Sequence, residues 1–466
     1  MTTHPIQELA RRLNTFGGTP ILVGGAVRDM VMAGATDPFT PTADYDIEVF
    51  GITLPRMKSC LWVEGYQFDD VGEQFSVLKV RVPGVEHPVD ISIPRYDRSV
   101  GSGHKEFEVM ADPSLTFAEA SKRRDFTMGA MGFNLITGEL LDPHNGAGHA
   151  RSGYIRHVSD QFAEDPLRPL RAARFAARFF GMIDSETLGI CGEMSDMASS
   201  LPSERVWMEL EKVLMEGHEI SWFFYYLEIM GWLEILFPEV AALRGVEQDS
   251  EWHPEGDVLT HTMCALNYWA ANLRTGNKKN DLITAIAILC HDFGKVTTTA
   301  WNGEKQRLTA WGHEEAGAEP TRNFLHRLRQ YELAKEVMPL VANHLAPVYG
   351  EPTAKSIRRL STKVRRLDLL ATVSRADQAG RPPKSYAEGF AKIDVFELLV
   401  SQLEIPVGGP KPWVDGRYLI AMGLTPGPVF KTILDDVYEK QIEGEVASEW
   451  EALMRAQFLV DEWGLN

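Results

Sequence analysis

The chain has 466 residues, of which 44% are hydrophobic and 24% are charged, a composition typical of globular proteins with roughly two to four domains. Its formal net charge of −18 argues against a protein that binds nucleic acid by charge over its whole surface, although it leaves room for a local basic groove. The four cysteines form no CxxC pair, and the N-terminal segment lacks the apolar core of a signal peptide. Cysteines scattered in this way fit reduced thiols, so we expect a cytoplasmic protein. Because no apolar run approaches about 18 residues, we expect no membrane span.

Strand-like runs separated by turns dominate the beginning of the chain. Apolar segments such as PILVGG, SVLKVRVPG and PVDISIP alternate with Gly and Pro turns, which is typical of an α/β or α+β domain. After Tyr154, apolar residues recur at three- and four-residue spacing, which predicts helices. The helical pattern continues to about residue 400 and contains several histidines in its second half. We therefore expect a head at 1–150, a helical neck at 151–245, a histidine-containing domain at 246–400 and a tail at 401–466.

The segment from Pro20 to Phe50 contains two motifs that suit the transfer of nucleotides. PILVGGAVRDMV predicts a strand that turns at Gly24 and Gly25 into a helix, whose free backbone N–H groups would bind phosphates. Arg28 in the first turn of this helix would add a charged clamp. On its own, a pair of glycines is more often an ordinary turn.

The second motif, ADYDIEVF, predicts a strand with Asp44 and Asp46 at alternate positions. Such residues share one face of a strand and lie about 7 Å apart at their Cα atoms, so the two carboxylates would hold Mg²⁺ between them. Bound metal lowers the pKa of an attacking hydroxyl and neutralises leaving pyrophosphate. Asp90 in PVDISI is a candidate for a third carboxylate, although an ordinary place at a strand edge fits it equally well.

Two basic segments follow, SKRRDFTMGAM at 121–131 and FAEDPLRPLRAARFAARF at 162–179. In EDPLR we expect Asp165 to be an N-cap and Pro166 the first helical residue. Asp165 and Arg168 would then lie close together, an acceptor beside a fork of donors that suits the Watson–Crick edge of a base. Further arginines continue along the same predicted helix face, a pattern that elsewhere usually marks a solvated surface.

The motifs GGAVRD, DxD, RRDFT and EDPLR, in this order, resemble those of the class II tRNA nucleotidyltransferases, which comprise bacterial CCA-adding enzymes and poly(A) polymerases. The resemblance covers essentially the whole chain. It implies a multidomain fold with an α+β nucleotidyltransferase head like that of DNA polymerase β, followed by all-α neck, HD and tail domains. It also implies roles for residues in the head and the neck. Asp44 and Asp46 would bind catalytic Mg²⁺, and the nucleotide would be bound by Gly24, Gly25, Arg28, Arg124, Asp165, Arg168, Arg171 and Arg174.

The resemblance further implies that Asp165 and Arg168 select CTP and ATP without a nucleic-acid template, and that the substrate is the 3′ end of tRNA. Two departures stand out: Gly129 where the family usually has Asn, and DPHNGAGHA where it usually has an acidic-apolar end. They leave open the alternative of an HD phosphohydrolase whose head only binds RNA. The resemblance also leaves open an A-adding or poly(A)-polymerase member, because these enzymes share the motifs and their specificity depends on a flexible loop, expected here within residues 98–120.

The second half of the chain contains His261, the adjacent His291-Asp292 in ILCHDFGK, and Asp377. This order resembles the HD phosphohydrolase superfamily. Imidazole and carboxylate together suit a divalent transition metal, or Mg²⁺ with more oxygen ligands, which would activate water for attack on a phosphoester. His313 and His344 would extend the set to two metals or line a phosphate pocket, and structural roles fit them equally well.

Some bacterial CCA-adding enzymes carry an HD domain with phosphatase and 2′,3′-cyclic phosphodiesterase activity, and this chain resembles them. The expected protein is thus a two-activity enzyme that acts on RNA 3′ ends, with CTP and ATP as substrates, Mg²⁺ in the head, and a tail that contacts RNA. The sequence gives no indication of the oligomeric state.

Overall fold

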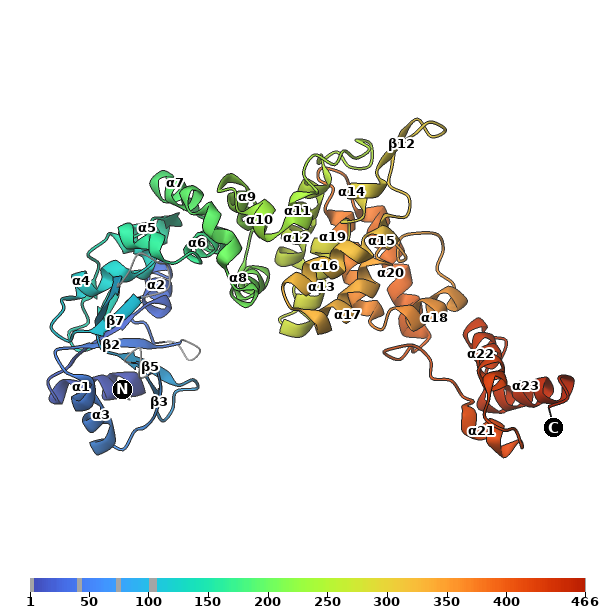
Figure 1. Cartoon of the computed structure of the whole chain (residues 1–466), viewed down its shortest axis with the longest axis horizontal. Coiled ribbons are helices and arrows are strands. Elements are labelled where there is room, and N and C mark those ends of the chain that lie inside the picture. Colours follow the sequence, from blue (N-terminus) through green and yellow to red (C-terminus); the bar gives the residue numbers. More distant parts are fainter. Residues whose placement is uncertain (1–3, 40–43, 73–76, 100–106, 466) are drawn as a thin grey trace. The chain divides into compact units, whose positions relative to one another are not determined.

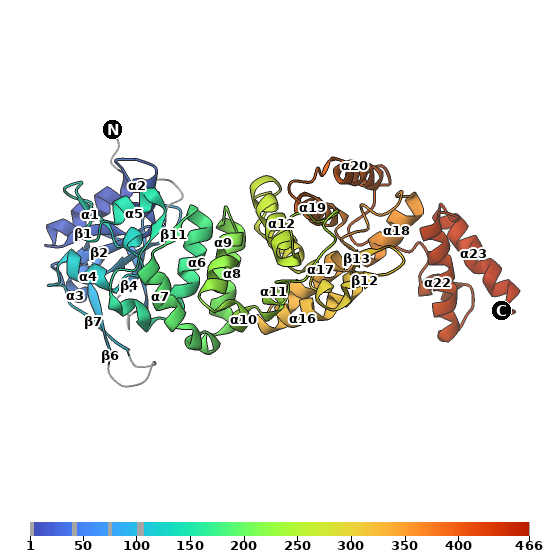
Figure 2. The same cartoon turned by 90° about the horizontal axis from the view of Figure 1, so that it is seen from above.

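The computed structural model describes residues 4–39, 44–72, 77–99 and 107–465. The chain divides into two units, one formed by Met1–Glu209 with Trp222–Trp232, and the other by Leu210–Ser221 with Leu233–Asn466. Figures 1 and 2 colour the first unit blue to green and the second mainly yellow to red. Among the described residues, no helix has both the length and the apolar character needed to cross a membrane.

A mixed seven-stranded sheet forms the centre of the first unit, with the strand order β3-β4-β5-β2-β1-β8-β9. Strands β2 and β5 run parallel, and every other neighbouring pair in the sheet is antiparallel. The strands are β1 Thr19–Val23, β2 Asp46–Phe50, β3 Gln67–Gly72, β4 Val77–Arg81, β5 Val89–Ser92, β8 Gly132–Asn134 and β9 Leu140–Leu141. This arrangement confirms the expected α+β head.

Helices pack onto this sheet and continue the unit beyond it. Buried Ile6, Leu9 and Leu13 form the apolar face of α1, which packs against β1 and α3. The helices of this unit are α1 Pro5–Thr15, α2 Gly25–Met32, α3 Leu54–Val63, α4 Phe117–Ala120, α5 Gly146–Ser152, α6 Arg168–Phe179, α7 Ser185–Glu193, and parts of α8 Ser203–Glu216 and α9 Ser221–Ile229.

An antiparallel ribbon of β6 Arg95–Ser99 and β7 Phe107–Ala111 extends from the head. The flexible loop expected within residues 98–120 begins in this ribbon. Residues 100–106, which include GSGHKE of the GSGHKEF segment, lie outside the described residues. The rest of that stretch forms β7 and α4.

The second unit is almost entirely helical, as expected. Helix α13 Lys278–Cys290 lies at its centre, and residues 283–290 are all buried because helices surround them. The helices that contact α13 most are α12 Val258–Asn272, α17 Tyr331–Val341 and α19 Leu367–Ala379. The remaining elements of this region are α10 Leu233–Leu236, α11 Pro238–Ala241, α14 Lys295–Thr298, β12 Ala300–Asn302, β13 Arg307–Thr309, α15 His313–Ala316, α16 Ala318–Arg327, α18 Ala354–Lys363 and α20 Ala387–Gln402.

The C-terminal tail has a small hydrophobic core of its own. Helices α22 Pro428–Glu443 and α23 Glu449–Glu462 pack as a hairpin beside the short α21 Gly416–Ala421 (Figure 1). Leu419, Ile433 and Leu459 are buried between them. The tail is therefore a folded element and not an extension of α20.

Candidate active sites in the head and the HD domain

The first candidate site forms where β1 turns into α2. Gly24 has φ +77°, a backbone conformation that residues with a side chain rarely adopt. A Cβ atom at this position would lie 3.1 Å from Oδ2 of Asp46, so the glycine also lets the N-terminus of α2 approach that carboxylate. The structure thus brings together the phosphate turn and the Asp pair that the sequence indicated.

The carboxylates are arranged differently from the expectation. Asp46 is the first residue of β2, whereas Asp44 precedes the strand, so the prediction that both lie within it was wrong. Asp90 on β5 is the register partner of Asp46. Although Asp46 as a residue remains exposed, partial burial of its carboxyl group raises the pKa to about 6, against the opposing effect of Arg124, and Asp90, Asp44 and Glu48 raise it further.

This crowding of like charges is what a bound cation would relieve, so the residues fit Mg²⁺. Lys79 partly offsets the charge of Asp90, since its Nζ lies 3.5 Å from Oδ1 of that residue.

Glu48 is a buried carboxylate that sequence reasoning missed. It is 2% exposed, and its Oε1 accepts hydrogen bonds from Nη2 of Arg124 at 3.1 Å and from Nη2 of Arg123. Nη1 of Arg124 also donates to the carbonyl oxygen of Gly129 at 3.4 Å. Glu48 therefore fixes Arg124 close to Asp46. The signal was present, because Asp44, Asp46 and Glu48 alternate in the sequence.

Arg28 lies further from solvent than expected. Its guanidinium is packed against α6, with the ring centroids of Phe179 and Phe175 at 4.9 Å and 5.5 Å, and its Nε donates to Oδ1 of Asp29 at 2.8 Å. Arg28 thus joins α2 to α6, and its contact with a nucleotide stays a prediction. Nη2 of Arg28 lies 3.6 Å from the place of a Cβ at Gly25.

The EDPLR segment differs in detail from the prediction. Helix α6 begins at Arg168 with Leu167 as its N-cap, so Asp165 and Pro166 precede the helix. Oδ1 of Asp165 accepts a hydrogen bond from the N–H of Leu167 at 3.0 Å, and Arg205 lies 3.4 Å from the same carboxylate. Because the side chain of Asp165 accepts a hydrogen bond from the N–H of Leu167, Asp165 lies in the turn that precedes the helix.

The guanidinium of Arg168 donates to two backbone carbonyls and not to Asp165. Nη1 bonds the carbonyl oxygen of Gln161 at 2.6 Å and Nη2 that of Arg123 at 2.8 Å. These bonds link α6 to the RRDFT segment. The expected base-reading pair is therefore divided between two sets of partners, and its role in nucleotide choice stays a prediction.

The arginines along α6 have different environments. Arg171 forms an ion pair with Asp125 of RRDFT, with Nε at 2.7 Å from Oδ2. Arg174 is 5% exposed, and its Nε lies 2.6 Å from Oε2 of the equally buried Glu209. Arg178 packs over the ring of Phe179 at 5.1 Å. The helix therefore presents no uniform basic stripe, and nucleotide contacts of Arg171 and Arg174 stay predictions.

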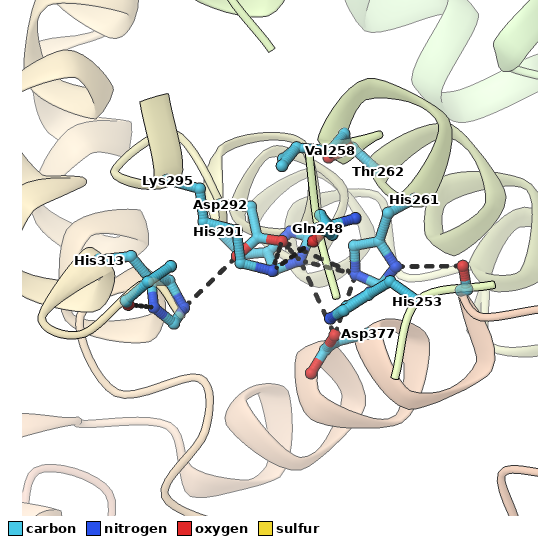
Figure 3. A network of polar contacts seen from close by, with 12 residues as sticks. Gln248, His253, Val258, His261, Thr262, His291, Asp292, Lys295, His313 and Asp377 are labelled. Carbon is cyan, nitrogen blue, oxygen red and sulfur yellow. Dashed lines mark hydrogen bonds and ion pairs between the residues drawn. The ribbon is translucent and has the colours of Figure 1, made fainter. Parts of the chain in front are cut away.

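The second candidate site collects the histidines of the HD domain (Figure 3). His261 comes from α12, His291 and Asp292 follow α13, and Asp377 comes from α19. Nε2 of His261 lies 3.0 Å from Oδ1 of Asp377 and 3.3 Å from Nε2 of His291. Nε2 of His291 lies 3.2 Å from Oδ2 of Asp292. The four residues expected from the sequence thus lie together, and all of them are buried.

Three histidines of this site each make the same kind of local hydrogen bond. The Nδ1 of each donates to the backbone carbonyl three residues earlier: His291 to Ile288 at 2.6 Å, His313 to Ala310 at 2.8 Å and His344 to Val341 at 2.7 Å. A histidine that donates through Nδ1 offers the lone pair of Nε2 when it is neutral. This is the form in which histidine binds a metal.

His313 and His344 belong to the same cluster. Nε2 of His313 lies 3.4 Å from Nε2 of His344 and 3.4 Å from Oδ1 of Asp292. Burial lowers the pKa of His344 to about 3, so this imidazole is neutral at physiological pH. Among the described residues, two buried sets offer donor atoms within 4.8 Å of one another, His261 with His291 and Asp377, and His291 with Asp292 and His344. These nitrogen and oxygen donors fit divalent metal.

Glu255 supports this site and was missed by sequence reasoning. Its Oε1 accepts hydrogen bonds from Nδ1 of His261 at 2.8 Å and from Nδ1 of His253 at 2.9 Å. Although burial opposes it, these two bonds lower the pKa of Glu255 to about 2. Two cations add to the support, since Arg381 lies 3.0 Å from Asp377 and Lys295 lies 2.7 Å from Asp292. The HPE triplet before α12 was the available signal.

Comparison with known proteins identifies both domains that carry these sites. Residues 21–156 match the family model of the poly(A) polymerase head domain, residues 182–243 the probable RNA and SrmB-binding site of polymerase A, and residues 258–396 the HD domain. The chain is 34% identical over 410 residues to the multifunctional CCA protein of Pasteurella multocida. The matched region covers 83% of this chain and 90% of that protein. The chain belongs to the CCA-adding tRNA nucleotidyltransferase family. It is a nucleotidyltransferase with an HD domain, as the motifs indicated.

Solved structures share the fold at low sequence identity. The CCA-adding enzyme of Bacillus stearothermophilus in complex with CTP has a TM-score of 0.67 and 20% identity, with 99% of this chain and all of that chain covered. The Thermotoga maritima CCA-adding enzyme complexed with tRNA has a TM-score of 0.55 and 18% identity, with 97% and 94% covered. These likenesses show a common architecture.

Proposed function

We propose that this protein adds CCA to the 3′ end of tRNA from CTP and ATP without a nucleic-acid template. The main support is the 34% identity that extends over 90% of a multifunctional CCA protein. The arrangement of Gly24, Asp46 and Arg124 at one end of β2 is consistent with it. A tRNA substrate also agrees with the cytoplasmic location expected from the sequence.

In this proposal, Asp46, Asp44 and Asp90 hold Mg²⁺, which would supply charge neutralisation for the triphosphate and the attacking 3′ hydroxyl. The N-terminus of α2 binds phosphate oxygens through its backbone N–H groups. Arg124, fixed by Glu48, contacts ribose or phosphate. Asp165 and Arg168 hydrogen-bond the base, for which they must first give up the backbone hydrogen bonds that they make in this structure.

The decisive assay uses a tRNA transcript that lacks its 3′ CCA, with Mg²⁺ and labelled CTP or ATP. We expect incorporation that Asp46→Ala abolishes and Asp292→Ala preserves. Products made with CTP alone, ATP alone and both separate CCA addition from A addition and from poly(A) synthesis. Absence of incorporation by the wild-type chain would refute the proposal.

We also propose that the HD domain hydrolyses 2′,3′-cyclic or terminal phosphates at RNA ends. The buried cluster of imidazoles and carboxylates around His291 supports this second activity. Release of phosphate from a 2′,3′-cyclic nucleotide should be lost in Asp292→Ala and kept in Asp46→Ala. Phosphate release without nucleotide incorporation would favour the alternative of an HD phosphohydrolase with an RNA-binding head.

A further inference from the structure

Three exposed tryptophans lie in segments that lead into the HD site. Trp252, Trp301 and Trp311 are 44%, 62% and 70% exposed. Trp252 directly precedes His253, and Trp311 lies two residues before His313. Trp301 is on β12, and the hairpin of β12 and β13 runs into Trp311. Figure 1 shows this hairpin projecting from the HD domain beside α14. Apolar rings exposed as a group mark a binding surface, whereas a single exposed ring does not.

Three cations accompany these rings. Nζ of Lys384 lies 3.9 Å from the ring centroid of Trp252, and the guanidinium of Arg307 lies 5.8 Å from the same centroid. Nζ of Lys305 lies 4.4 Å from the ring centroid of Trp311. We call these three tryptophans and three cations the aromatic rim.

The contacts of Trp252 join three separate segments at the edge of the HD site. Arg307 belongs to β13, which leads to His313, and Lys384 follows Arg381, the partner of Asp377. Nζ of Lys384 also donates to the backbone carbonyl of Glu251 at 3.0 Å. The aromatic rim is therefore tied to the segments that carry the metal-binding side chains.

Exposed aromatic rings interleaved with Lys and Arg are the combination that binds single-stranded nucleic acid, because bases stack on the rings while the cations contact the backbone. This local grouping contrasts with the net charge of −18 of the whole chain. A single nucleotide would contact only the buried cluster around His291, whereas an RNA strand would also contact the aromatic rim.

We propose that the aromatic rim binds the single-stranded 3′ end of RNA and holds its terminal phosphate at the HD site. This inference rests on the proposed phosphohydrolase activity at RNA ends, and it assigns the binding of the RNA strand to the aromatic rim.

The test compares a 2′,3′-cyclic mononucleotide with a short oligoribonucleotide that ends in a 2′,3′-cyclic phosphate. In Trp311→Ala and Trp301→Ala, we expect KM for the oligonucleotide to rise by about 5-fold or more, the effect of one lost base stack, while kcat stays the same. Hydrolysis of the mononucleotide should not change, and Trp311→Phe should restore the wild-type KM. Trp62→Ala is the matched control, because Trp62 is 78% exposed on α3 of the head.

Equal losses on both substrates, or no loss on the oligonucleotide, would overturn the proposal. If the wild-type chain hydrolyses neither substrate, the proposed phosphohydrolase activity fails by itself. The rim is then tested by binding of a labelled oligoribonucleotide with a 3′ hydroxyl to the full chain. Weaker binding in Trp311→Ala than in Trp62→Ala would support the rim, and equal binding would refute it.

Discussion

Asp46 and Asp90 are register partners on β2 and β5, the one parallel pair of strands in the described part of the head sheet. Burial is the main cause of the raised pKa of Asp46, and the negative charge of Asp90 raises this pKa further. Because neighbouring carboxylates repel each other, a cation shared by Asp46 and Asp90 would stabilise the pair.

Replacement of Asp90 should therefore impair nucleotide addition. We expect Asp90→Asn to lower the rate of CTP incorporation by about 100-fold or more, the range for loss of a group that assists proton transfer. Asp69→Asn, on the exposed edge strand β3, is the control. A rate within a factor of two of the wild type would show that Asp90 is only a strand residue.

Glu255 should act on the HD site through His261. Removing the negative charge of Glu255 weakens its hydrogen bond to Nδ1 of His261. We therefore expect Glu255→Gln to reduce metal affinity by about 10- to 100-fold, as is usual for residues that hydrogen-bond a metal ligand. Hydrolysis of a 2′,3′-cyclic nucleotide should recover at higher metal concentration, while CCA addition stays the same. Failure to recover at saturating metal would argue against a positioning role.

The buried pair of Arg174 and Glu209 gives a prediction about stability. Arg174→Met removes the close partner of the buried Glu209 and leaves it only Arg171, whose Nη1 lies 3.8 Å from its Oε1. We expect the free energy of unfolding to fall by up to about 3–5 kcal/mol, the range for breaking a buried ion pair. The double variant Arg174→Met/Glu209→Leu should regain most of the lost free energy of unfolding, as measured by urea denaturation. If the double variant is stable but incorporates no nucleotide, Arg174 also has the predicted nucleotide contact.

Gly129 tests the departure from the family pattern. A Cβ at this position would meet only Oδ1 of Asp125, at the ordinary distance of 3.8 Å. We therefore expect Gly129→Asn to change the free energy of unfolding by less than about 0.5 kcal/mol, as for a tolerated surface site. Its incorporation of CTP and ATP should remain near the wild-type rate. A large gain in rate would show that the glycine weakens the head.

Acid should destabilise the HD domain through its buried histidines. Burial lowers the pKa of His344 to about 3 and that of His253 to about 4, below the ordinary value of 6.5. Unfolded chains therefore bind protons here that the folded protein does not, and the free energy of unfolding should fall as pH drops below 6.5. Each such histidine contributes up to about 1.4 kcal/mol per pH unit. Thermal unfolding of metal-free protein at several pH values measures this slope, which His344→Asn should reduce.

Much of this organisation could be predicted from local pattern. The glycine turn beside Asp46 and the HD residues were recognisable from spacing, and the structure brings each group together, whereas Asp44 lies before the strand. Glu48 and Glu255 were missed because their roles depend on partners distant in the sequence or on burial. The start of α6 was misplaced because Asp165 caps Leu167 in a turn before the helix.

The environments of Arg28 and Arg174 could not be read from sequence either. A charged residue in a basic segment is normally solvated, yet both guanidinium groups are buried by contacts with aromatic rings or with Glu209. Only the three-dimensional packing of α6 decides which arginines of that helix reach solvent.

The carbonyl-bonded histidines of the HD site have a consequence for metal exchange. Each of His291, His313 and His344 is oriented by an acceptor only three residues away, so its alignment is built into a single turn of chain. Ligands aligned in this way keep their orientation when the ion leaves. A divalent ion bound by these nitrogens would then be replaced by another without rearrangement of the backbone.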